Sequence, residues 1–346
     1  MRAIVFEEFG GPLAVRDVAD PVPDRGGAVV RVEATGLCRS DWHGWRGHDP
    51  SIALPHVPGH ELAGTVEAVG ADVTRIRPGQ RVTTPFVCAC GRCPACARGA
   101  QQVCERQEQP GFTHWGSFAQ YVALRHADVN LVPLPDDVTA TTAASLGCRF
   151  ATAFRAVVDQ GGVRPGEWTA VYGCGGVGLS AVMVAAAAGA RVIAVDVAPG
   201  ALELARRFGA EVCVDASAAG PDVAASVREA SGGGVDLSLD ALGSPETCTR
   251  SVASLRAHGR HVQIGLLPDG VRLPMDRVIA LELSILGSHG MPAHAYPALM
   301  SLVASGGLRP DLLITRRLSL AEAPAALAGL DGPGVPGVTV IGPYDD

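Results

Sequence analysis

The sequence predicts an α/β protein in which a doubly wound parallel sheet of six strands is joined to a β-rich domain. Three observations carry this prediction. Residues 1 to about 150 hold short β-prone runs separated by Gly and Pro. From about residue 151 to 287, β-prone runs alternate with helix-prone segments, as in a parallel sheet covered by helices. The length of 346 residues suits about two domains.

The β-rich part is predicted to be discontinuous. Its strand candidates lie at residues 3–6, 27–34, 61–69, 80–83 and 117–124. Such short strands indicate a compact barrel-like or sandwich-like domain. Residues 337–341 read as one more strand within the tail 288–346. We therefore expect residues 1–150 and 288–346 to form one domain and residues 151–287 to form the other.

The second part contains enough strands for a complete dinucleotide-binding sheet, which has six. The strand candidates are residues 170–172, 192–195, 212–215, 235–240, 261–265 and 283–287. The helix candidates between them are residues 179–188, 201–208, 223–230 and 247–257. This order predicts a Rossmann-type domain.

A glycine-rich turn joins the first of these strands to its helix. Gly173, Gly175 and Gly178 form the pattern G-x-G-x-x-G within GCGGVG, which also contains Gly176 and Val177. The first glycine permits a tight turn, the second lets a pyrophosphate approach, and the third lets helix and strand pack closely. The N-terminus of the helix then offers free N–H groups to phosphates. These five residues are therefore predicted to bind a dinucleotide.

Asp196 ends the second strand, 18 residues after Gly178. A carboxylate there can accept hydrogen bonds from a ribose 2′-hydroxyl and would repel a 2′-phosphate, which favours NAD over NADP. Two alternatives remain open: a doubly wound domain without a nucleotide, and a membrane span over the uncharged residues 169–190. Clustered glycines and a preceding β-prone run argue against the span.

The overall composition excludes some classes of function. The net charge of −7 and the pI near 5.8 suggest no basic face for a nucleic-acid partner. The N-terminal MRAIVFEEFG lacks the long apolar centre of a signal peptide, so we expect a cytoplasmic protein that is not bound to a membrane. Ten cysteines in such a chain indicate metal or redox chemistry more than disulfides.

Four cysteines are spaced C-x2-C-x2-C-x7-C at Cys90, Cys93, Cys96 and Cys104. Thiolates on a turning backbone can converge on a tetrahedral zinc ion, and four of them close its coordination shell. The spacing therefore predicts a structural zinc site. An iron–sulfur cluster and free thiols are the alternatives. A nucleic-acid-binding zinc ribbon has the same pattern, but the acidic composition disfavours it.

A second group of possible ligands comes from GLCRSDWH, which contains Cys38, and from VPGHE, which contains His60. A lone cysteine or histidine is more often packed than ligating, and their spacing alone does not bring them together. With these motifs the whole chain resembles the zinc-dependent medium-chain dehydrogenases of the alcohol dehydrogenase family. The resemblance rests on GLCRSDWH, GHE, the four-cysteine loop, GCGGVG followed by Asp196, and their order.

The resemblance implies a catalytic zinc held by Cys38, His60 and Cys148, the last in SLGCRFATAF. With three protein ligands, one coordination position stays open, which distinguishes a catalytic from a structural zinc. Glu61 corresponds to an acid beside the metal that either ligates transiently or stays outside the ligand shell. Asp41 corresponds to a carboxylate that orients the histidine ligand.

The resemblance also implies roles around the reacting alcohol. Ser40 corresponds to the hydroxyl that takes the alcohol proton and His43 to the imidazole at the far end of that relay. Arg39 corresponds to a side chain that can reach the pyrophosphate, although it can equally be solvated. Phe86 and Trp115 correspond to pocket-lining aromatics, although Phe86 can equally belong to the core.

The predicted function is therefore an NAD-dependent zinc alcohol dehydrogenase that contains two zinc ions per chain and acts on a primary or secondary alcohol, an aldehyde or a ketone. A polyol, sugar-alcohol or amino-alcohol dehydrogenase of the same family is the alternative, because the motif residues are shared. A non-catalytic zinc- and nucleotide-binding regulatory protein is a third. Short chains of this kind are expected to be dimers or tetramers, with residues 283–287 at an edge suited to dimer contacts.

Overall fold

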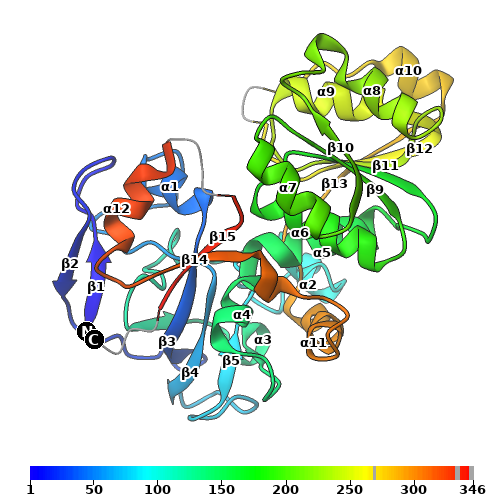
Figure 1. Cartoon of the computed structure of the whole chain (residues 1–346). Helices are drawn as coiled ribbons and strands as arrows, with labels where there is room; N and C mark the ends of the chain where they lie inside the picture. The colour runs from blue at the N-terminus through cyan, green and yellow to red at the C-terminus, as the bar shows by residue number, and fades with distance from the viewer. Residues whose placement is uncertain (268–269, 332–335, 343–346) are drawn as a thin grey trace. The chain divides into compact units, whose positions relative to one another are not determined.

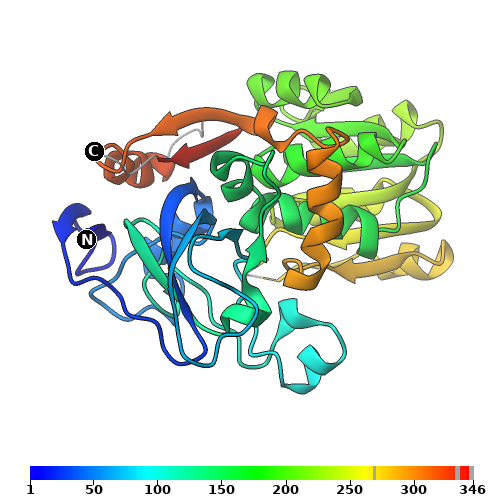
Figure 2. The ribbon, with the colours of Figure 1, turned by 90° about the horizontal axis from the view of Figure 1, so that it is seen from below.

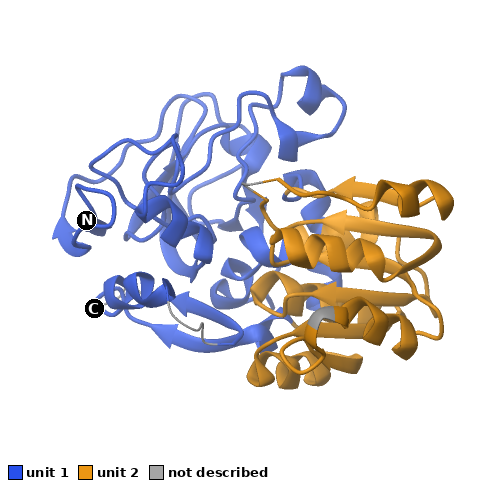
Figure 3. Cartoon of the chain, turned by 90° about the horizontal axis from the view of Figure 1, so that it is seen from above, with its two compact units in different colours: residues 1–151, 290–306, 310–346 blue, residues 152–289, 307–309 orange. Residues whose placement is uncertain are grey.

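A computed structural model describes residues 1–267, 270–331 and 336–342, and the chain divides into two compact units (Figures 1 and 3). The first unit comprises residues 1–151, 290–306 and 310–346, and the second comprises residues 152–289 and 307–309. The residues of the predicted tail at 332–335 and 343–346 lie outside the described part.

The second unit is built on a six-stranded parallel sheet, which confirms the predicted fold class. Its strands follow the spatial order β10-β9-β8-β11-β12-β13, and every pair in it is parallel. The order reverses between β8 and β11, and ligands of such sheets bind at the carboxyl ends of the strands beside this point. The bounds are β8 Trp168–Tyr172, β9 Arg191–Asp196, β10 Ala210–Asp215, β11 Val235–Asp240, β12 Leu255–Gln263 and β13 Ser284–Gly287.

Helices cover both faces of this sheet (Figure 1). They are α6 Gly176–Ala187, α7 Pro199–Arg207, α8 Val223–Ala230, α9 Pro245–Ala253 and α10 Met275–Ala280. Helix α6 is apolar on all sides because the protein surrounds it, and eight of its 12 residues are buried. Gly189, with φ of +81°, follows the end of this helix. Among the described residues, no helix has the length and apolarity that a membrane crossing requires.

The bounds predicted for the helix before β12 were wrong at both ends. The helix predicted at residues 247–257 is α9, which begins earlier and ends at Ala253. Ser244 caps its start by accepting the N–H of Thr247 at 3.0 Å, and Pro245 occupies its first turn. Leu255 is fully buried and lies opposite Val235 in the sheet, so tertiary pairing draws these residues into β12.

The first unit contains a seven-stranded sheet in the order β14-β15-β3-β4-β5-β7, with β6 paired to β3, and a separate β1-β2 pair. The bounds are β1 Arg2–Val5, β2 Ala14–Asp17, β3 Ala28–Leu37, β4 Leu62–Val69, β5 Arg81–Thr83, β6 Tyr121–Leu124, β7 Val132–Pro133, β14 Ile314–Leu318 and β15 Val338–Ile341. Strand β15 pairs antiparallel with β3, so the last strand of the chain joins the sheet that contains β3. Sequence patterns did not predict β2, β7 or β14.

Short helices occur around this sheet. They are α1 Arg39–Trp45, α2 Pro94–Ala97, α3 Ala127–Asn130, α4 Ala140–Ala144, α11 Tyr296–Ala304 and α12 Ala323–Ala328. After α4, π-helical turns at Leu146–Phe150 and Ala156–Gln160 flank α5 Ala151–Arg155. The core contains fully buried side chains such as Phe6, Leu62 and Phe118. Figure 2 shows the segment that contains α2, drawn in cyan, as a lobe projecting from this unit.

Candidate functional site: two cysteine-containing clusters and a glycine loop

The projecting lobe brings four cysteines together. The sulfurs of Cys90, Cys93, Cys96 and Cys104 all lie within 4.8 Å of one another, with Cys93 at 3.4 Å from Cys96 and 3.7 Å from Cys104. Zinc–sulfur bonds of about 2.3 Å place tetrahedral ligands about 3.8 Å apart, so this cluster fits zinc. Helix α2 begins directly after Cys93, and its first turn returns Cys96 to the same side.

The protonation of these thiols also suits a metal site. The backbone N–H of Cys96 points at the Cys93 sulfur and lowers the pKa of that thiol to about 6. Burial raises the pKa of Cys96 to about 12. A metal must therefore displace protons from part of the cluster when it binds. Cys88 lies outside the cluster, and burial raises the pKa of its thiol to about 12.

A second cluster combines residues from three separate segments of the first unit. Ligand atoms of Cys38, His60, Glu61 and Cys148 all lie within 4.8 Å of one another. Cys38 directly precedes α1, His60 lies just before β4, and Cys148 sits on the π-helical turn Leu146–Phe150. A hydrogen bond from Cys148 lowers the pKa of the Cys38 thiol and raises that of Cys148, so the two sulfurs face each other.

Asp41 orients the imidazole of this cluster. One carboxylate oxygen of Asp41 accepts the Nδ1–H of His60 at 2.8 Å and the N–H of Gly59 at 3.1 Å. The other oxygen accepts the N–H of Cys38 at 2.9 Å. A carboxylate acceptor places the proton of the neutral His60 imidazole on Nδ1, which leaves the Nε2 of that neutral ring free to bind a metal.

That Nε2 atom is buried and has no hydrogen-bond partner among the described residues. A buried polar nitrogen without a partner is costly, and the two neighbouring sulfurs offer no strong donor. A zinc ion held by Nε2 and the sulfurs of Cys38 and Cys148 would satisfy all three groups. The residues present therefore fit a zinc site with two thiolates and one imidazole.

Glu61 is held by an arginine that the sequence reasoning did not identify. The backbone N–H and the Nε–H of Arg149 donate to one carboxylate oxygen at 3.1 and 3.0 Å, and an NH2 group of Arg149 donates to the other. Both side chains are buried. Gly36 makes room for the pair, because a Cβ there would collide with the Glu61 carboxylate. Arg149 directly follows Cys148, and that adjacency is the signal that could have identified it.

Aromatic rings border the His60 imidazole. Phe86 lies with its ring centroid 6.3 Å from that of His60, and Phe112, which the sequence analysis did not identify, lies at 5.4 Å. Both contacts are edge-on. Trp115 is 37% exposed and donates its indole N–H to the carbonyl of Pro55 at 2.9 Å. Phe86 is therefore beside a candidate ligand, whereas the indole of Trp115 is hydrogen-bonded to a loop carbonyl.

The remaining candidates of the relay lie on α1. The hydroxyl oxygen of Ser40 is 3.7 Å from the sulfur of Cys38. His43 is exposed, and its Nδ1 lies 2.9 Å from the Nδ1 of His48. The guanidinium of exposed Arg39 lies over the ring of Trp42, 5.5 Å from its centroid. One short helix thus presents all three residues beside the Cys38 ligand.

In the second unit, the three motif glycines have different surroundings. Gly173 adopts φ of +87°, which a turn after a strand favours in glycine. A Cβ on Gly178 would collide with the carbonyl oxygen of Gly173. A Cβ on Gly175 would meet no atom within 4 Å, so space is open beside the N-terminus of α6, which starts with Gly176 and Val177. The backbone thus leaves room where the motif predicts a pyrophosphate.

Asp196 connects to this loop at the end of β9. Its carboxylate accepts the N–H of Cys174 at 2.6 Å and the N–H of Ala198 at 2.8 Å. The acid and the glycine turn are therefore adjacent within the unit, as the ribose assignment requires.

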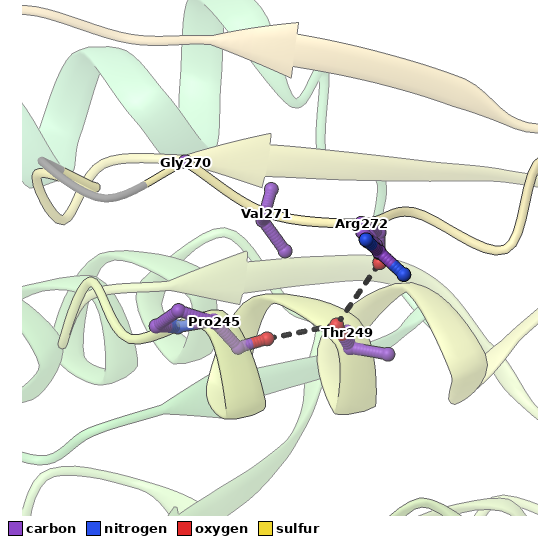
Figure 4. Close-up of a pocket in the computed structure, with 5 residues that line it drawn as sticks. All are labelled: Pro245, Thr249, Gly270, Val271 and Arg272. Carbon is purple, nitrogen blue, oxygen red and sulfur yellow. Dashed lines mark hydrogen bonds between the residues drawn. The ribbon is translucent and has the colours of Figure 1, made fainter.

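A surface hollow of the second unit is a poor candidate for catalysis (Figure 4). It is lined by Pro245, Thr249, Gly270, Val271 and Arg272. Thr249 donates to the carbonyl of Pro245 at 2.8 Å, and the described residues that line the hollow include no thiol, imidazole or carboxylate. The metal-ligating chemistry lies in the cysteine-containing clusters.

Comparison with known proteins assigns the family. Residues 24–136 match the model of the alcohol dehydrogenase GroES-like domain, and residues 176–305 match that of the zinc-binding dehydrogenases. An alcohol dehydrogenase of Geobacillus stearothermophilus is 36% identical over 83% of this chain and 84% of its own length. The chain belongs to the zinc-dependent alcohol dehydrogenase family of medium-chain dehydrogenases.

Other relatives show the range of this family. An L-threonine 3-dehydrogenase of Streptomyces coelicolor is 32% identical over 95% of both chains. The crystal structure of a zinc-binding dehydrogenase from Sinorhizobium meliloti bound to NADP is 31% identical, covers 99% of both chains and superposes with a TM-score of 0.88. The β-rich part of an alcohol dehydrogenase is its GroES-like domain, which agrees with the predicted fold class.

We expect two glycine substitutions in this chain to separate folding from nucleotide binding. Gly178→Ala forces a methyl group into the Gly173 carbonyl and should lower the free energy of unfolding by about 1–3 kcal/mol. The methyl group of Gly175→Ala would meet no described atom within 4 Å and should change the free energy of unfolding by less than about 0.5 kcal/mol. The methyl would still obstruct the pyrophosphate, so NADH should bind about tenfold more weakly, a loss of about 1.4 kcal/mol.

Thermal unfolding and titration of NADH fluorescence measure the two effects. Wild-type affinity for NADH in Gly175→Ala would contradict the assignment of the glycine loop.

Loss of the Arg149 guanidinium should leave Glu61 buried without its counter-ion. We expect Arg149→Met to lower the free energy of unfolding by about 3–5 kcal/mol. Adding Glu61→Gln should recover most of that loss, because no buried charge remains. As a control, Arg25→Met breaks an exposed pair with Asp72 and should cost less than about 1 kcal/mol. Urea unfolding measures all three.

The same variants report on the metal. Once Arg149 no longer holds Glu61, the Glu61 carboxylate should turn towards the metal. It already lies within 4.8 Å of the other candidate ligand atoms. In cobalt-substituted protein, Arg149→Met should change the visible ligand-field absorption and the double variant should restore it. An unchanged spectrum in Arg149→Met would show that Arg149 does not control Glu61.

Proposed function

We propose that this protein is an NAD-dependent zinc alcohol dehydrogenase that transfers hydride reversibly between NAD and a primary or secondary alcohol, with an aldehyde or ketone as the oxidised partner. One observation carries the proposal: Cys38, His60 and Cys148 converge, and the buried Nε2 of His60 has no hydrogen-bond partner among the residues that the structure describes. Three ligands leave a tetrahedral metal one position for substrate. The four-cysteine cluster, in contrast, offers a complete shell.

Two zinc ions per chain are therefore proposed, one at each cluster. Zinc at the three-ligand site, when bound, supplies a Lewis acid that makes an alcohol proton easier to remove, and NAD supplies the hydride acceptor. The protein contributes orientation and a shielded pocket. Asp41 keeps His60 in the correct tautomer, Arg149 holds Glu61, and Phe86 and Phe112 exclude water beside the imidazole.

Protons are proposed to leave through residues of α1. Ser40 lies beside Cys38 and can accept the alcohol proton only transiently, because a hydroxyl does not retain an extra proton near neutral pH. His43 can retain one, since imidazole titrates in this range. His43 is exposed and so can exchange its proton with solvent. We assign Ser40 to the start and His43 to the outer part of the relay, and Arg39 to the pyrophosphate.

The preference for NAD is proposed on the basis of Asp196. Its carboxylate lies against the glycine turn and would repel a 2′-phosphate. Val197, Ala198 and Pro199 follow it, so the sequence directly after the acid has no cation to attract that phosphate. A relative with bound NADP shows that family membership alone does not decide between the two cofactors.

A second candidate function is an amino-alcohol, polyol or sugar-alcohol dehydrogenase. The supporting observation is the L-threonine 3-dehydrogenase that aligns over 95% of this chain. The same metal and relay residues would serve either substrate class, and only the pocket would differ.

We also propose that the protein is a homo-oligomer, with the edge strand β13 in a dimer contact. Among the described strands, β13 pairs only with β12, and Ile285 on it and Ile279 on α10 are 38% and 74% exposed. An apolar sheet edge of this kind invites pairing. Sedimentation equilibrium should therefore give at least twice the 35.5 kDa of one chain. A monomer at micromolar concentration would refute this proposal.

One experiment tests the proposed activity together with its metal and cofactor. Simple alcohols, polyols and amino alcohols are supplied with NAD or NADP, formation of the reduced cofactor is followed by absorbance, and zinc is measured by mass spectrometry. Wild type should contain two zinc ions per chain and reduce NAD with a simple alcohol. Cys148→Ala should lose one zinc and nearly all activity. Cys88→Ala, which removes a buried thiol outside both clusters, should keep both zinc ions and the wild-type activity.

The variant Asp196→Ala tests the cofactor preference. It should bind NAD more weakly and discriminate less against NADP. An unchanged preference would remove Asp196 from ribose recognition. Oxidation of threonine or a polyol without oxidation of simple alcohols would favour the second candidate function. A fully active Cys148→Ala variant would refute the proposed catalytic site.

A further inference from the structure

Two histidines form a pair at the outer end of α1. After α1 ends, Gly47 adopts φ of +79° and turns the chain back on itself. The N–H of His48 donates to the carbonyl of His43 at 3.0 Å. The Nδ1 atoms of the two rings lie 2.9 Å apart, and the ring centroids are 5.2 Å apart. The turn therefore places a second imidazole in hydrogen-bond contact with His43.

Contact between two Nδ1 atoms requires one shared proton. One ring carries the proton and donates it, and the other accepts it. The Nε2 atom of each ring then points away from the shared bond. Each ring can consequently exchange a second proton at Nε2 while it passes the first through Nδ1.

Trp42 holds both rings in place. Its ring meets His43 edge-on at 4.9 Å and His48 at 5.7 Å between centroids. Trp42 is itself covered by the guanidinium groups of Arg39 and Arg46, 5.5 and 5.8 Å from the ring centroid. The pair is therefore supported by packing and does not rest on one hydrogen bond alone.

The surroundings discourage a resting positive charge on His43. Burial by its neighbours is the largest cause that lowers the pKa of His43. The nearby charges of His48 and Arg39 lower this pKa further, whereas Cys38 raises it. A proton that arrives on His43 is thus readily given up.

We propose that His48 is a second proton carrier of this site, which accepts the proton leaving Nδ1 of His43 and releases a proton to solvent. This inference rests on the proposed alcohol dehydrogenase function, which supplies the proton. It assigns a role to a histidine that no motif of the sequence identified.

The proton balance of this step is complete. His43 begins with a proton on Nδ1 and a bare Nε2, and it gains the relay proton at Nε2. Its Nδ1–H bond breaks as an Nδ1–H bond forms on His48. His48, now an imidazolium, loses its Nε2 proton to water or buffer. Exchange with solvent restores the starting tautomers, and no electrons are transferred.

Substitution of His48 by asparagine separates proton transfer from positioning. The amide of His48→Asn stands where Nδ1 stood and keeps a hydrogen bond to His43, but it cannot carry a proton. Alcohol oxidation should fall about tenfold or more in both His48→Asn and His48→Ala, and imidazole buffer should restore much of it. His294→Asn, which removes an exposed imidazole elsewhere, should leave the rate and its pH profile unchanged.

The pH dependence gives a second readout. Without the charge of His48, one cause that lowers the pKa of His43 is gone, so that pKa rises. The acid limb of the rate profile should therefore move to higher pH in His48→Asn. Nitrogen-15 NMR of the zinc-loaded protein should show a proton shared between the two Nδ1 atoms in the wild type, and in His48→Asn it should show His43 titrating at higher pH than in the wild type.

Several results would overturn the proposal. Wild-type rates in His48→Asn with slow turnover in His48→Ala would show that His48 only positions His43. Wild-type rates in both would show that it has no role, and NMR spectra of the wild type without a proton shared between the two Nδ1 atoms would exclude proton sharing. None of these results would contradict the proposed function as long as the wild type oxidises an alcohol. If the wild type oxidises no alcohol, the proposed function fails and the relay fails with it.

Discussion

The site in the first unit depends on one carboxylate. Asp41 receives the Nδ1–H of His60, the N–H of Gly59 and the N–H of Cys38, and so ties together two segments that are about 20 residues apart in sequence. The same carboxylate caps the first turn of α1. One buried group thereby begins a helix, selects the tautomer of an imidazole and aligns it with a neighbouring sulfur. The geometry of the cluster follows from these three hydrogen bonds.

Charged side chains also surround this cluster. The sulfur of Cys38 and the Glu61 carboxylate place negative charge in a buried region, and Arg149 is a cation that offsets it. Its position next to Cys148 means that one π-helical turn delivers both a candidate ligand and its counter-charge. Extra-wide turns of this kind are often found at functional sites, because they redirect side chains without ending the helix. Gly36 is small because the ion pair occupies the space of its side chain.

The second unit solves a different problem, which is to bring a backbone close to a negatively charged ligand. Gly178 packs against Gly173 while Gly175 faces open space, so the motif consists of two packing positions and one open position. In the first unit, the turn at Gly47 uses another property of glycine, since the left-handed backbone there returns His48 to His43. Glycine thus leaves open space in one place and permits a left-handed turn in the other.

Local sequence determined the elements whose cause is local. The glycine turn with α6, the parallel strands β8 to β13 and the four-cysteine loop could all be predicted, because periodicity, turn residues and ligand spacing act over a few residues. The family was also within reach, because its motifs stand in a characteristic order. The start and end of α9 were misjudged because Ser244 capping and the pairing of Leu255 with β11 outweighed helix propensity.

Only the tertiary structure decided which distant side chains meet. Nothing in the spacing of His60 and Cys148 places them beside Cys38, and no local pattern links Arg149 to Glu61, 88 residues away. The contact of His48 with His43 is close in sequence, yet it depends on the handedness of one turn and on the support of Trp42. Such contacts are set by the packing of whole elements, and packing is a property of the folded chain that short windows of sequence do not contain.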